Sequence, residues 1–482
     1  MPSHAPASAP AVGAQASLRF TDLLANGQAV GRLDGFVVFV WGPLPGERAQ
    51  VRITEVKPKY AVAELVGYET RSPHRSEPFC PVFGVCGGCQ VQHLDYPAQL
   101  AWKQHIVRSA LQRIGGFEDI DVRRPVGMDE PRAYRNKMAL VVDASGPQTA
   151  FGFYQARSHD LVRIESCPVV LPQLDGAIAG LYRAASAPGS AGALRETKHA
   201  IVRAGTASGE AVVSLTTAHR SAAIAAAAPE IAAAIPGVVG VSNSFEPRTV
   251  NAVLGREMAY VWGQRDMEET IEGVRYRVSP ASFFQVNSEM VGRIFRFLAP
   301  GVTKGRAIVD LYCGAGTFAI FFGTRGARVI GIEENPAAVA EARANAHRNR
   351  VGDRVRFVRG RVEGEVVNDE GKNALAAADV VFLDPPRKGS DEATLAAVAG
   401  AGVPNLWYLS CNPATLARDL AFLAERGYRL GTVQPFDMFP QTGHVETLVT
   451  LHRGDARAVT LPEREPTRWD ELLPAWPPPE AD

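Results

Sequence analysis

Cys411 lies in a setting that favours nucleophilic chemistry. It follows an apolar run at residues 406–409, and Asn412 and Pro413 interrupt the strand pattern before a helical pattern over residues 414–426. The thiol is therefore expected at the carboxyl end of a sheet strand, where open α/β sheets bind their ligands. A thiol near a helix start and bound cationic groups can ionise, and the thiolate is the nucleophile. On this stretch alone, a cysteine that serves only packing is the alternative.

Four other cysteines have the residue type and spacing of a metal site. Cys80, Cys86 and Cys89 form a C-x₅-C-x₂-C segment, with two glycines between the last pair that let the backbone fold closely around a metal. Cys167 is the candidate for a fourth ligand. Four thiolates suit either zinc or an iron–sulfur cluster, and the spacing alone leaves both open. Unrelated free thiols are the remaining alternative.

A strand, a glycine turn and a helix are predicted around residues 307–318. The turn, Asp310-Leu-Tyr-Cys-Gly-Ala-Gly316, lets the backbone approach a ligand that side chains would block. The next strand pattern ends at Glu333, where a carboxylate can bind both hydroxyls of a ribose, and Glu334 is the neighbour that could take its place. The turn is similar to motif I of class I methyltransferases and lacks the full G-x-G-x-x-G pattern of a dehydrogenase.

Arg132, Arg135 and Lys137 form a short cationic segment around Tyr134. Such a segment can hold phosphates while the aromatic ring stacks on a base, so it is a candidate RNA contact. A solvated charged surface explains it equally well.

Composition limits the class of protein. The 482 residues are too many for one typical core, so several domains are expected. The 51 basic and 51 acidic residues give no net charge, which neither supports nor excludes nucleic acid as a partner. No apolar run is long enough for a membrane span, and the first residues lack a signal-peptide pattern. Six cysteines without a secretion signal indicate a reducing compartment, and we expect a cytoplasmic protein.

The pattern of elements predicts how these residues are positioned. Short β-rich runs near the N-terminus indicate a small barrel, a β-rich region follows, and a βαβ series occupies the last part. The expected segments are a disordered tail (1–17), a β-barrel (18–67), a central domain with the four cysteines (68–275), a catalytic domain (276–453) and an irregular tail (454–482). An amphipathic helix at about 95–115 could pack on the catalytic domain.

Five motifs occur in order and identify a resemblance. They are Ser-Phe-Phe-Gln-Val-Asn at 282–287, the glycine turn at 310–316, Asp-Pro-Pro-Arg at 384–387, Ser-Cys-Asn-Pro at 410–413 and His-Val-Glu at 444–446. With the four cysteines and the Gly-x-Leu-Asp-Gly…Leu-Pro-Gly-Glu pattern of the first module, they resemble the RNA 5-methyluridine methyltransferase family. The resemblance is to its iron–sulfur, TRAM-containing branch, such as the 23S ribosomal RNA uracil-5 methyltransferases, and spans about residues 18–452.

The resemblance implies the fold. We expect an α/β protein with a C-terminal Rossmann-like class I methyltransferase domain whose sheet is mixed and mostly parallel. We also expect an N-terminal OB-like TRAM β-barrel that binds RNA, and a central α+β domain that carries the four-cysteine site.

The resemblance also implies ligands and site residues. S-adenosylmethionine is the expected methyl donor, and a 4Fe–4S cluster, with zinc as the alternative, is expected on the four cysteines. RNA is the expected partner, with ribosomal RNA favoured and transfer RNA possible, and the protein is expected to be a monomer without membrane attachment. The residues implied to contact the cofactor or orient the base are Gln285, Tyr312, Gly314, Glu333 and Asp384.

Uracil chemistry explains why Cys411 and Glu446 would act together. Carbon 5 is a poor nucleophile, but a thiolate added at carbon 6 makes an enolate that is nucleophilic at carbon 5. After methyl transfer a base removes the carbon 5 proton, and elimination frees the thiol. Glu446 follows a turn at 440–444 and fits the role of the general base that removes this proton. The target base must leave its stack to reach both groups.

Other functions stay open on the sequence alone. The protein could be a non-catalytic RNA-binding assembly factor, or a methyltransferase acting on cytosine or on DNA. The cluster is expected to be structural, because methyl transfer moves no net electrons.

Overall fold

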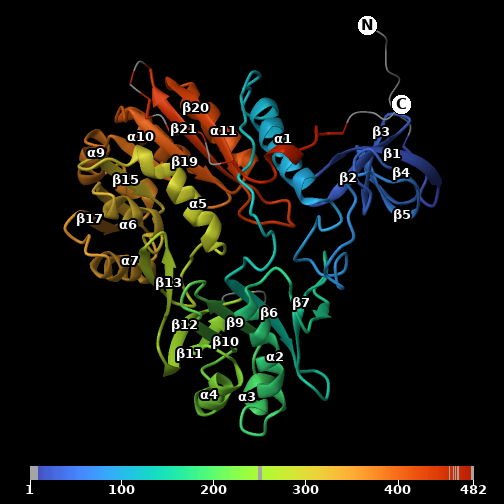
Figure 1. The fold of residues 1–482 in the computed structure, drawn as a ribbon, viewed down its shortest axis with the longest axis horizontal. Coiled ribbons are helices and arrows are strands. Elements are labelled where there is room, and N and C mark those ends of the chain that lie inside the picture. The colour runs from blue at the N-terminus through green and yellow to red at the C-terminus, as the bar shows by residue number, and fades with distance from the viewer. Residues whose placement is uncertain are drawn as a thin grey trace.

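The chain forms three units, a small β-barrel, a central α+β unit and a larger α/β unit, with helix α1 between the barrel and the α/β unit (Figure 1). This computed structural model describes residues 9–247, 252–454 and 466–478, together with residues 456, 458, 459, 461 and 463. No helix that it describes has the length and apolar character needed to cross a membrane.

The N-terminal unit is a closed barrel in the strand order β1-β2-β3-β5-β4. Its strands are β1 (Gln15–Leu23), β2 (Gln28–Leu33), β3 (Phe36–Trp41), β4 (Arg48–Val56) and β5 (Tyr60–Thr70). Inward and outward residues alternate along β3, where Phe36, Val38 and Val40 are buried. Strand β1 begins within the tail expected over 1–17, and residues 1–8 of that tail lie outside the described residues.

Helix α1 (Tyr96–Arg113) joins the barrel to the α/β unit. Asp95 caps its first turn by accepting a hydrogen bond from the amide of Ala98 at 2.8 Å. Trp102 is buried in the barrel core, and its indole N–H donates to the carbonyl of Leu23 at 2.8 Å. Val107 belongs instead to the core of the α/β unit, where α1 contacts α11 and β20. One helix therefore fixes the barrel against the α/β unit.

The central unit is a sheet in the order β12-β11-β10-β9-β6-β7-β8, with three helices packed on it. Its strands are β6 (Lys137–Asp143), β7 (Ala150–Tyr154), β8 (Leu161–Arg163), β9 (His199–Ala204), β10 (Ala211–Thr216), β11 (Val238–Pro247) and β12 (Gly255–Gly263). Its helices are α2 (Pro172–Ser186), α3 (Ala191–Arg195) and α4 (Ala222–Ala234). Strands β9 and β10 are buried along their whole lengths, so the core of this unit is at the middle of the sheet.

A hairpin of β13 (Met267–Ile271) and β14 (Val274–Val278) connects the central unit to the α/β unit. Its buried residues join the core of the α/β unit, and the hydroxyl of Tyr276 donates to the carbonyl of Thr317 at 2.7 Å. Buried residues of this hairpin therefore contribute to the core of the α/β unit, although several of them precede residue 276, where the catalytic domain was expected to begin. The strands are too short for their alternation alone to assign them to one domain.

The α/β unit contains a mixed sheet in the order β17-β16-β15-β18-β19-β21-β20. Its strands are β15 (Ala307–Leu311), β16 (Arg328–Glu333), β17 (Val355–Arg359), β18 (Val380–Leu383), β19 (Asn405–Ser410), β20 (Tyr428–Phe436) and β21 (Glu446–Arg453). The first five are parallel to one another, and β21 is antiparallel to both β19 and β20. All side chains of β18 and β19 are buried, as expected of parallel strands covered on both faces.

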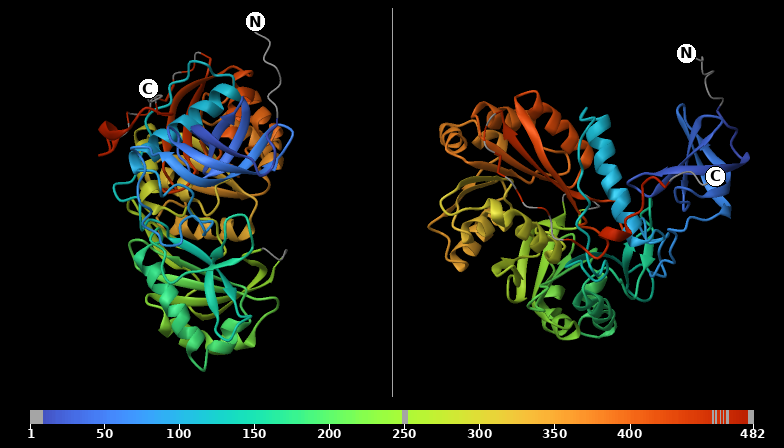
Figure 2. Two further views of the ribbon diagram at one scale, coloured as in Figure 1. Left: turned by 90° about the vertical axis from the view of Figure 1, so that its right-hand side faces the viewer. Right: turned by 45° about the horizontal axis from the view of Figure 1, so that its top comes forward.

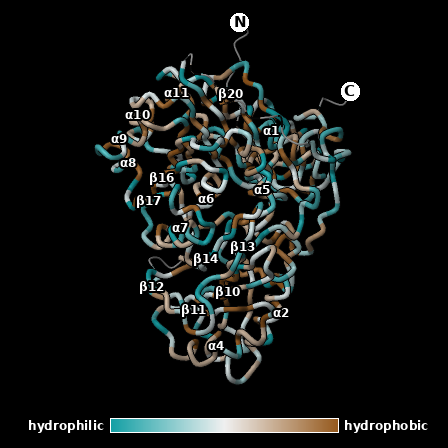
Figure 3. Tube along the Cα trace, turned by 60° about the vertical axis from the view of Figure 1, so that its left-hand side comes forward, coloured by the Kyte–Doolittle hydropathy of each residue, from teal (hydrophilic) through white to brown (hydrophobic). Residues whose placement is uncertain are grey.

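Helices cover both faces of this sheet, and hydrophobic residues lie along its strands (Figure 3). The helices are α5 (Ser288–Leu298), α6 (Thr317–Thr324), α7 (Pro336–Arg348), α8 (Val362–Glu365), α9 (Asp369–Ala376), α10 (Glu392–Gly400) and α11 (Pro413–Ala424), with 3₁₀ turns η1 (Ala299–Gly301) and η2 (Asp470–Leu472).

The C-terminal segment 466–478 returns toward the barrel (Figure 2). The indole N–H of Trp469 donates to the carbonyl of Met128 at 2.7 Å, and its ring meets Tyr96 edge-on at 5.2 Å. Trp476 packs against the barrel core. The irregular tail expected here thus makes defined contacts with other parts of the chain.

Candidate active site

Cys411 and Glu446 lie at the ends of neighbouring antiparallel strands. In the register of β19 and β21, Leu409 is opposite Leu448 and Ser410 is opposite Thr447. Continuing this register by one residue brings Cys411 beside Glu446, the first residue of β21, and Glu446 is close enough to raise the pKa of the Cys411 thiol. Asn412 caps α11 by accepting a hydrogen bond from Ala414, so the chain turns into a helix directly after the thiol. The two residues proposed for chemistry therefore meet at one sheet edge.

Burial and neighbouring acids oppose ionisation of Cys411. Burial raises the pKa of its thiol to about 11, with further contributions from Glu446 and Asp384, and Arg387 partly offsets them. The protein's own groups therefore favour the thiol over the thiolate, opposite to what the helix start led us to expect. The sequence pattern predicts the helix after Cys411, but it does not show that the fold brings the carboxyl groups of Glu446 and Asp384 close to the thiol.

Glu446 is almost fully buried, with 2% of its surface exposed. Its Oε1 has no hydrogen-bond partner among the described residues. Burial, followed by the charge of Asp384, raises the pKa of the carboxyl group well above its usual range, and Arg387 lowers it. A buried carboxyl oxygen without a partner is costly for stability, and such groups are concentrated at functional sites.

Asp384 follows β18 directly and connects the two ends of the site. Burial raises its pKa to about 7, and a hydrogen bond from Gln285 opposes that shift. Nε2 of Gln285 donates to Oδ2 of Asp384 at 3.4 Å. Gln285 is held in turn by Asn136, whose side chain donates to the carbonyl of Gln285 at 3.0 Å. The two implied cofactor residues are thus in contact.

The glycine turn after β15 faces Glu333 at the end of β16. The amide of Gly314 donates to Oε2 of Glu333 at 3.1 Å, whereas Glu334 is exposed. Gly314 has a φ of +53°, and a Cβ there would meet no other atom within 4 Å, so the turn borders open space. Tyr312 also has a positive φ of 66°, and its hydroxyl is 2.9 Å from Oγ of Ser390. This arrangement fits a nucleoside whose ribose reaches Glu333.

The strand order sets the order of the site residues. Strands β16, β15, β18, β19 and β21 are consecutive neighbours in the sheet. The residues that end, follow or begin them, in the same order, are Glu333, Tyr312 with Gly314, Asp384, Cys411 and Glu446. The groups expected to contact the cofactor nucleoside thus lie on one side of Asp384, and the thiol and carboxyl pair lies on the other.

The four cysteines Cys80, Cys86, Cys89 and Cys167 line one cavity of about 220 Å³. The pKa of Cys89 is raised to about 12, mainly by burial and to a smaller extent by the neighbouring cysteines, and a hydrogen bond with Gln92 opposes this shift. The described residues contain no group of three or more His, Cys, Asp or Glu side chains arranged to hold a metal ion. The fold therefore brings the thiols to one cavity without forming a single-ion site.

The cationic segment differs from its expected form. Tyr134 is buried, and its hydroxyl donates to the carbonyl of Pro440 at 3.0 Å, so its ring cannot stack on a base. Arg132 is exposed and lies over the ring of Phe79 at 4.0 Å. Nε of Arg135 donates to the carbonyl of Lys137, and burial lowers the pKa of Lys137 to about 7. The predicted stacking of Tyr134 on a base is therefore wrong. The segment enters the core at Tyr134, although its charged residues suggested an exposed surface.

Three residues near the site were given no role on sequence grounds. Asn136 lies within the cationic segment and was not singled out there. An uncharged amide between Arg135 and Lys137 could have drawn attention to it. Arg387 and His444 belonged to recognised motifs, and in the structure their side-chain nitrogens are 3.5 Å apart. Burial and Arg387 lower the pKa of His444 to about 4.

Comparison with known proteins places these features in a family. Residues 95–454 match the model of the tRNA (uracil-5-)-methyltransferase family, and residues 12–66 match the TRAM domain. An uncharacterized RNA methyltransferase of Bacillus cereus is 35% identical over 90% of this chain and 95% of the relative. Another from Thermosynechococcus vestitus is 38% identical over 91% of this chain and 98% of the relative.

A solved structure shares the fold over nearly the whole chain. It is the Pyrococcus abyssi tRNA (uracil-54, C5)-methyltransferase in complex with S-adenosyl-L-homocysteine, with a TM-score of 0.69 and 26% identity over 90% of this chain and 99% of that one. The chain therefore belongs to the tRNA (uracil-5-)-methyltransferase family, a family of S-adenosylmethionine-dependent RNA uracil-5-methyltransferases, and carries an N-terminal TRAM domain.

Proposed function

We propose that the protein methylates carbon 5 of a uridine in RNA through a covalent bond between Cys411 and carbon 6 of the base. The observation that carries this proposal is the antiparallel register of β19 and β21, which pairs Ser410 with Thr447 and so brings the adjoining residues Cys411 and Glu446 to the same end of the two strands. The buried Oε1 of Glu446 has no hydrogen-bond partner among the described residues and can accept a proton there.

The side chains divide the reaction between them. Sγ of Cys411 adds to carbon 6, and carbon 5 then takes the methyl group that S-adenosylmethionine supplies. Glu446 removes the carbon 5 proton, after which the bond between sulfur and carbon 6 breaks and the thiolate is restored. Arg387 favours the thiolate of Cys411, which the two nearby acids disfavour.

Five residues are proposed to hold the methyl donor and the base. Glu333 would bind the ribose hydroxyls beside Gly314 and Tyr312, because these three groups meet at one turn. Asp384 and Gln285, in contact between that turn and the thiol, would orient the base.

Trapping the covalent intermediate tests this mechanism. Cys411→Ala will abolish turnover, because it removes the proposed nucleophile. Glu446→Gln will accumulate a protein–RNA adduct that survives denaturing electrophoresis, because elimination needs the base. The RNA should come from a strain that lacks this gene, and nucleoside mass spectrometry should identify 5-methyluridine. Turnover by Cys411→Ala would contradict the mechanism.

We propose ribosomal RNA as the substrate class, supported by the four cysteines and the TRAM domain that the 23S ribosomal RNA enzymes share by resemblance. Transfer RNA is the second candidate, because the similar Pyrococcus abyssi enzyme acts on tRNA. Methylation of separated ribosomal and transfer RNA fractions from the deletion strain will distinguish the two.

We propose that Cys80, Cys86, Cys89 and Cys167 hold a 4Fe–4S cluster. A cavity of about 220 Å³ is large for one zinc ion, since a water molecule occupies only about 30 Å³, and a cluster spreads its ligands around several atoms. The cluster would be structural. Anaerobically purified protein should contain iron and sulfide, Cys86→Ser should lose both, and Cys411→Ala should retain them. Stoichiometric zinc without iron would contradict the proposal.

A further inference from the structure

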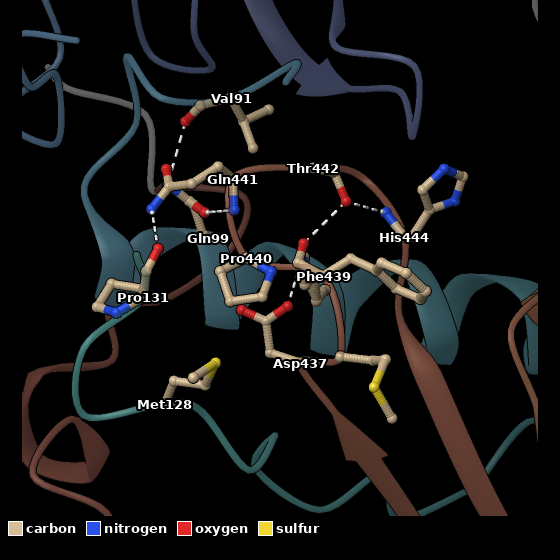
Figure 4. A network of polar contacts seen from close by, with 12 residues as sticks. Val91, Gln99, Met128, Pro131, Asp437, Phe439, Pro440, Gln441, Thr442 and His444 are labelled. Atoms are coloured by element: carbon tan, nitrogen blue, oxygen red, sulfur yellow. Dashed lines mark hydrogen bonds and ion pairs between the residues drawn. The ribbon is translucent and has the colours of Figure 1, made fainter. Parts of the chain in front are cut away.

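We propose that a buried amide pair, Gln99 and Gln441, positions Glu446 for proton removal. Gln441 belongs to the connection 437–445 between β20 and β21 (Figure 4). Glu446 is the first residue of β21. The inference rests on the proposed role of Glu446 and adds positioning residues that have no role in binding the substrate.

Gln441 is held in a conformation that glutamine rarely adopts. Its φ is +70°, in the left-handed region, and only 3% of its surface is exposed. A non-glycine residue there is strained and persists only where the surroundings impose it. The shape of the connection is therefore determined by its contacts with other parts of the chain.

The side chains of Gln99 and Gln441 pair across the interface between α1 and this connection. Oε1 of Gln99 accepts from the backbone amide of Gln441 at 3.1 Å, and its Nε2 donates to Oε1 of Gln441 at 2.9 Å. Nε2 of Gln441 donates to the carbonyl of Pro131 at 3.2 Å. Two hydrogen bonds thus fix one glutamine against the other, and a third fixes Gln441 against the segment before β6.

The cysteine-rich segment supports Gln441 from a further side. The amides of Gln90 and Val91 both donate to the carbonyl of Gln441, at 3.0 and 3.1 Å. Gln99 also donates to the carbonyls of Val91 and Leu94. Each polar group of Gln441 therefore has a partner, and the partners come from three separate segments of the chain.

The start of the connection has a separate anchor. Lys103 and Asp437 form an ion pair in which both side chains are fully buried, and Lys103 also donates to the carbonyl of Phe439 at 3.0 Å. Tyr96 donates to the other carboxyl oxygen of Asp437. Asp437 therefore fixes the start of the connection. The amide pair fixes the part that follows, and with it the position from which β21 and Glu446 enter the site.

Displacement of Glu446 has a kinetic signature that general destabilisation lacks. The base acts only after methyl transfer, so loss of its position leaves thiol addition and methylation intact and slows elimination. The methylated covalent adduct should then accumulate. A merely structural defect would instead lower the amount of active protein and form no excess adduct.

The test compares the same substitution at two glutamines of α1. Gln99→Met removes the amide pair, whereas Gln104→Met, the matched control, removes one hydrogen bond to the carbonyl of Val122 and does not contact the connection. We expect Gln99→Met to slow turnover by roughly 10- to 100-fold. The adduct should accumulate as in Glu446→Gln, and binding of S-adenosylmethionine should not change. Gln104→Met should behave as the unsubstituted protein.

A second variant covers the case in which Gln99→Met does not fold. Gln441→Gly removes the amide but accepts a positive φ without strain, so it should fold and still accumulate adduct. Loss of turnover in the folded variants without adduct, while Glu446→Gln forms one, would overturn the inference. Absence of adduct from Glu446→Gln as well would instead overturn the proposed function.

Discussion

At the scale of single residues, burial affects the proposed catalytic pair, Cys411 and Glu446, more than neighbouring charges do. Burial is the largest cause that raises the pKa of both groups, and Asp384 raises both pKa values further. Arg387 is the nearby cation that lowers both pKa values. The surroundings thus oppose ionisation of both groups, and the cationic sulfonium of the methyl donor is a group whose charge would favour both anions.

The thiol of Cys411 provides a direct test of this balance. With its pKa raised to about 11, alkylation by iodoacetamide should increase about tenfold per pH unit from pH 7 toward that value, because only the thiolate reacts. Arg387→Met should shift the profile to higher pH, since Arg387 lowers the pKa. The adjacent Lys388→Met is the matched control and should leave the profile unchanged. Mass spectrometry of the peptide that contains Cys411 measures the rate of alkylation. A shift of the pH profile to lower pH in Arg387→Met would contradict the role of Arg387.

Glu333 and Glu334 form a second matched pair. Glu333→Gln should weaken binding of S-adenosylmethionine about tenfold or more, because a charged acceptor of hydrogen bonds is lost. Glu334→Gln should bind normally, since this side chain is exposed and outside the turn. Isothermal titration calorimetry compares the two dissociation constants. Equal affinities would remove Glu333 from the proposed site.

At the scale of elements, α1 supports the site by joining units that are distant in sequence. Its tryptophan lies in the barrel core, its apolar residues lie in the α/β core, and its polar residues hold the connection between β20 and β21. The loop that carries Gln285 is held in the same way from the central unit, by Asn136. Loops of the α/β unit that carry the proposed site residues are thus fixed by elements that precede that unit in sequence.

Removal of one partner of the ion pair between Lys103 and Asp437 should destabilise the protein more than removal of both partners. Lys103→Met leaves a buried carboxylate without its cation and should lower the free energy of unfolding by about 3–5 kcal/mol. The double substitution Lys103→Met with Asp437→Leu should recover most of this loss, because no buried charge remains. Urea unfolding at neutral pH measures the three proteins. A double variant no more stable than Lys103→Met would show that the pair is not an independent unit.

At the scale of the whole molecule, the C-terminal segment joins the region of α1 to the barrel. The indole of Trp469 donates a hydrogen bond to the carbonyl of Met128 and its ring packs on Tyr96, and Trp476 packs on the barrel core. The barrel, which matches the TRAM domain, is thereby held at a fixed place beside the α/β unit.

Loss of Trp469 should loosen this link. Trp469→Ala removes a hydrogen bond and an aromatic pair, so amides of residues 466–478 should exchange faster with deuterium, by about tenfold, since about 1 kcal/mol or more of local stability is lost. Leu472→Ala, at an exposed position of the same segment, is the matched control and should leave exchange unchanged. Mass spectrometry of exchanged peptides compares the two, and equal exchange would contradict the role of Trp469.

Local sequence patterns were sufficient to predict parts of the site. Apolar runs followed by turn residues placed the glycine turn and Cys411 at the ends of strands, and the helical pattern over residues 414–426 corresponds to α11 (Pro413–Ala424). These signals are short-range, because strand ends, caps and helical periodicity depend on residues that are close in sequence.

Contacts between segments that are distant in sequence could be known only from the folded chain. The register of β19 and β21, the burial of Tyr134, the place of the β13–β14 hairpin and the pairing of Gln99 with Gln441 have no signal in local pattern. The pKa of Cys411 belongs with them, since it depends on which carboxyl groups approach the thiol and on how much water the fold excludes. Burial and electrostatic interaction act through space, so they are fixed only once the whole chain has packed.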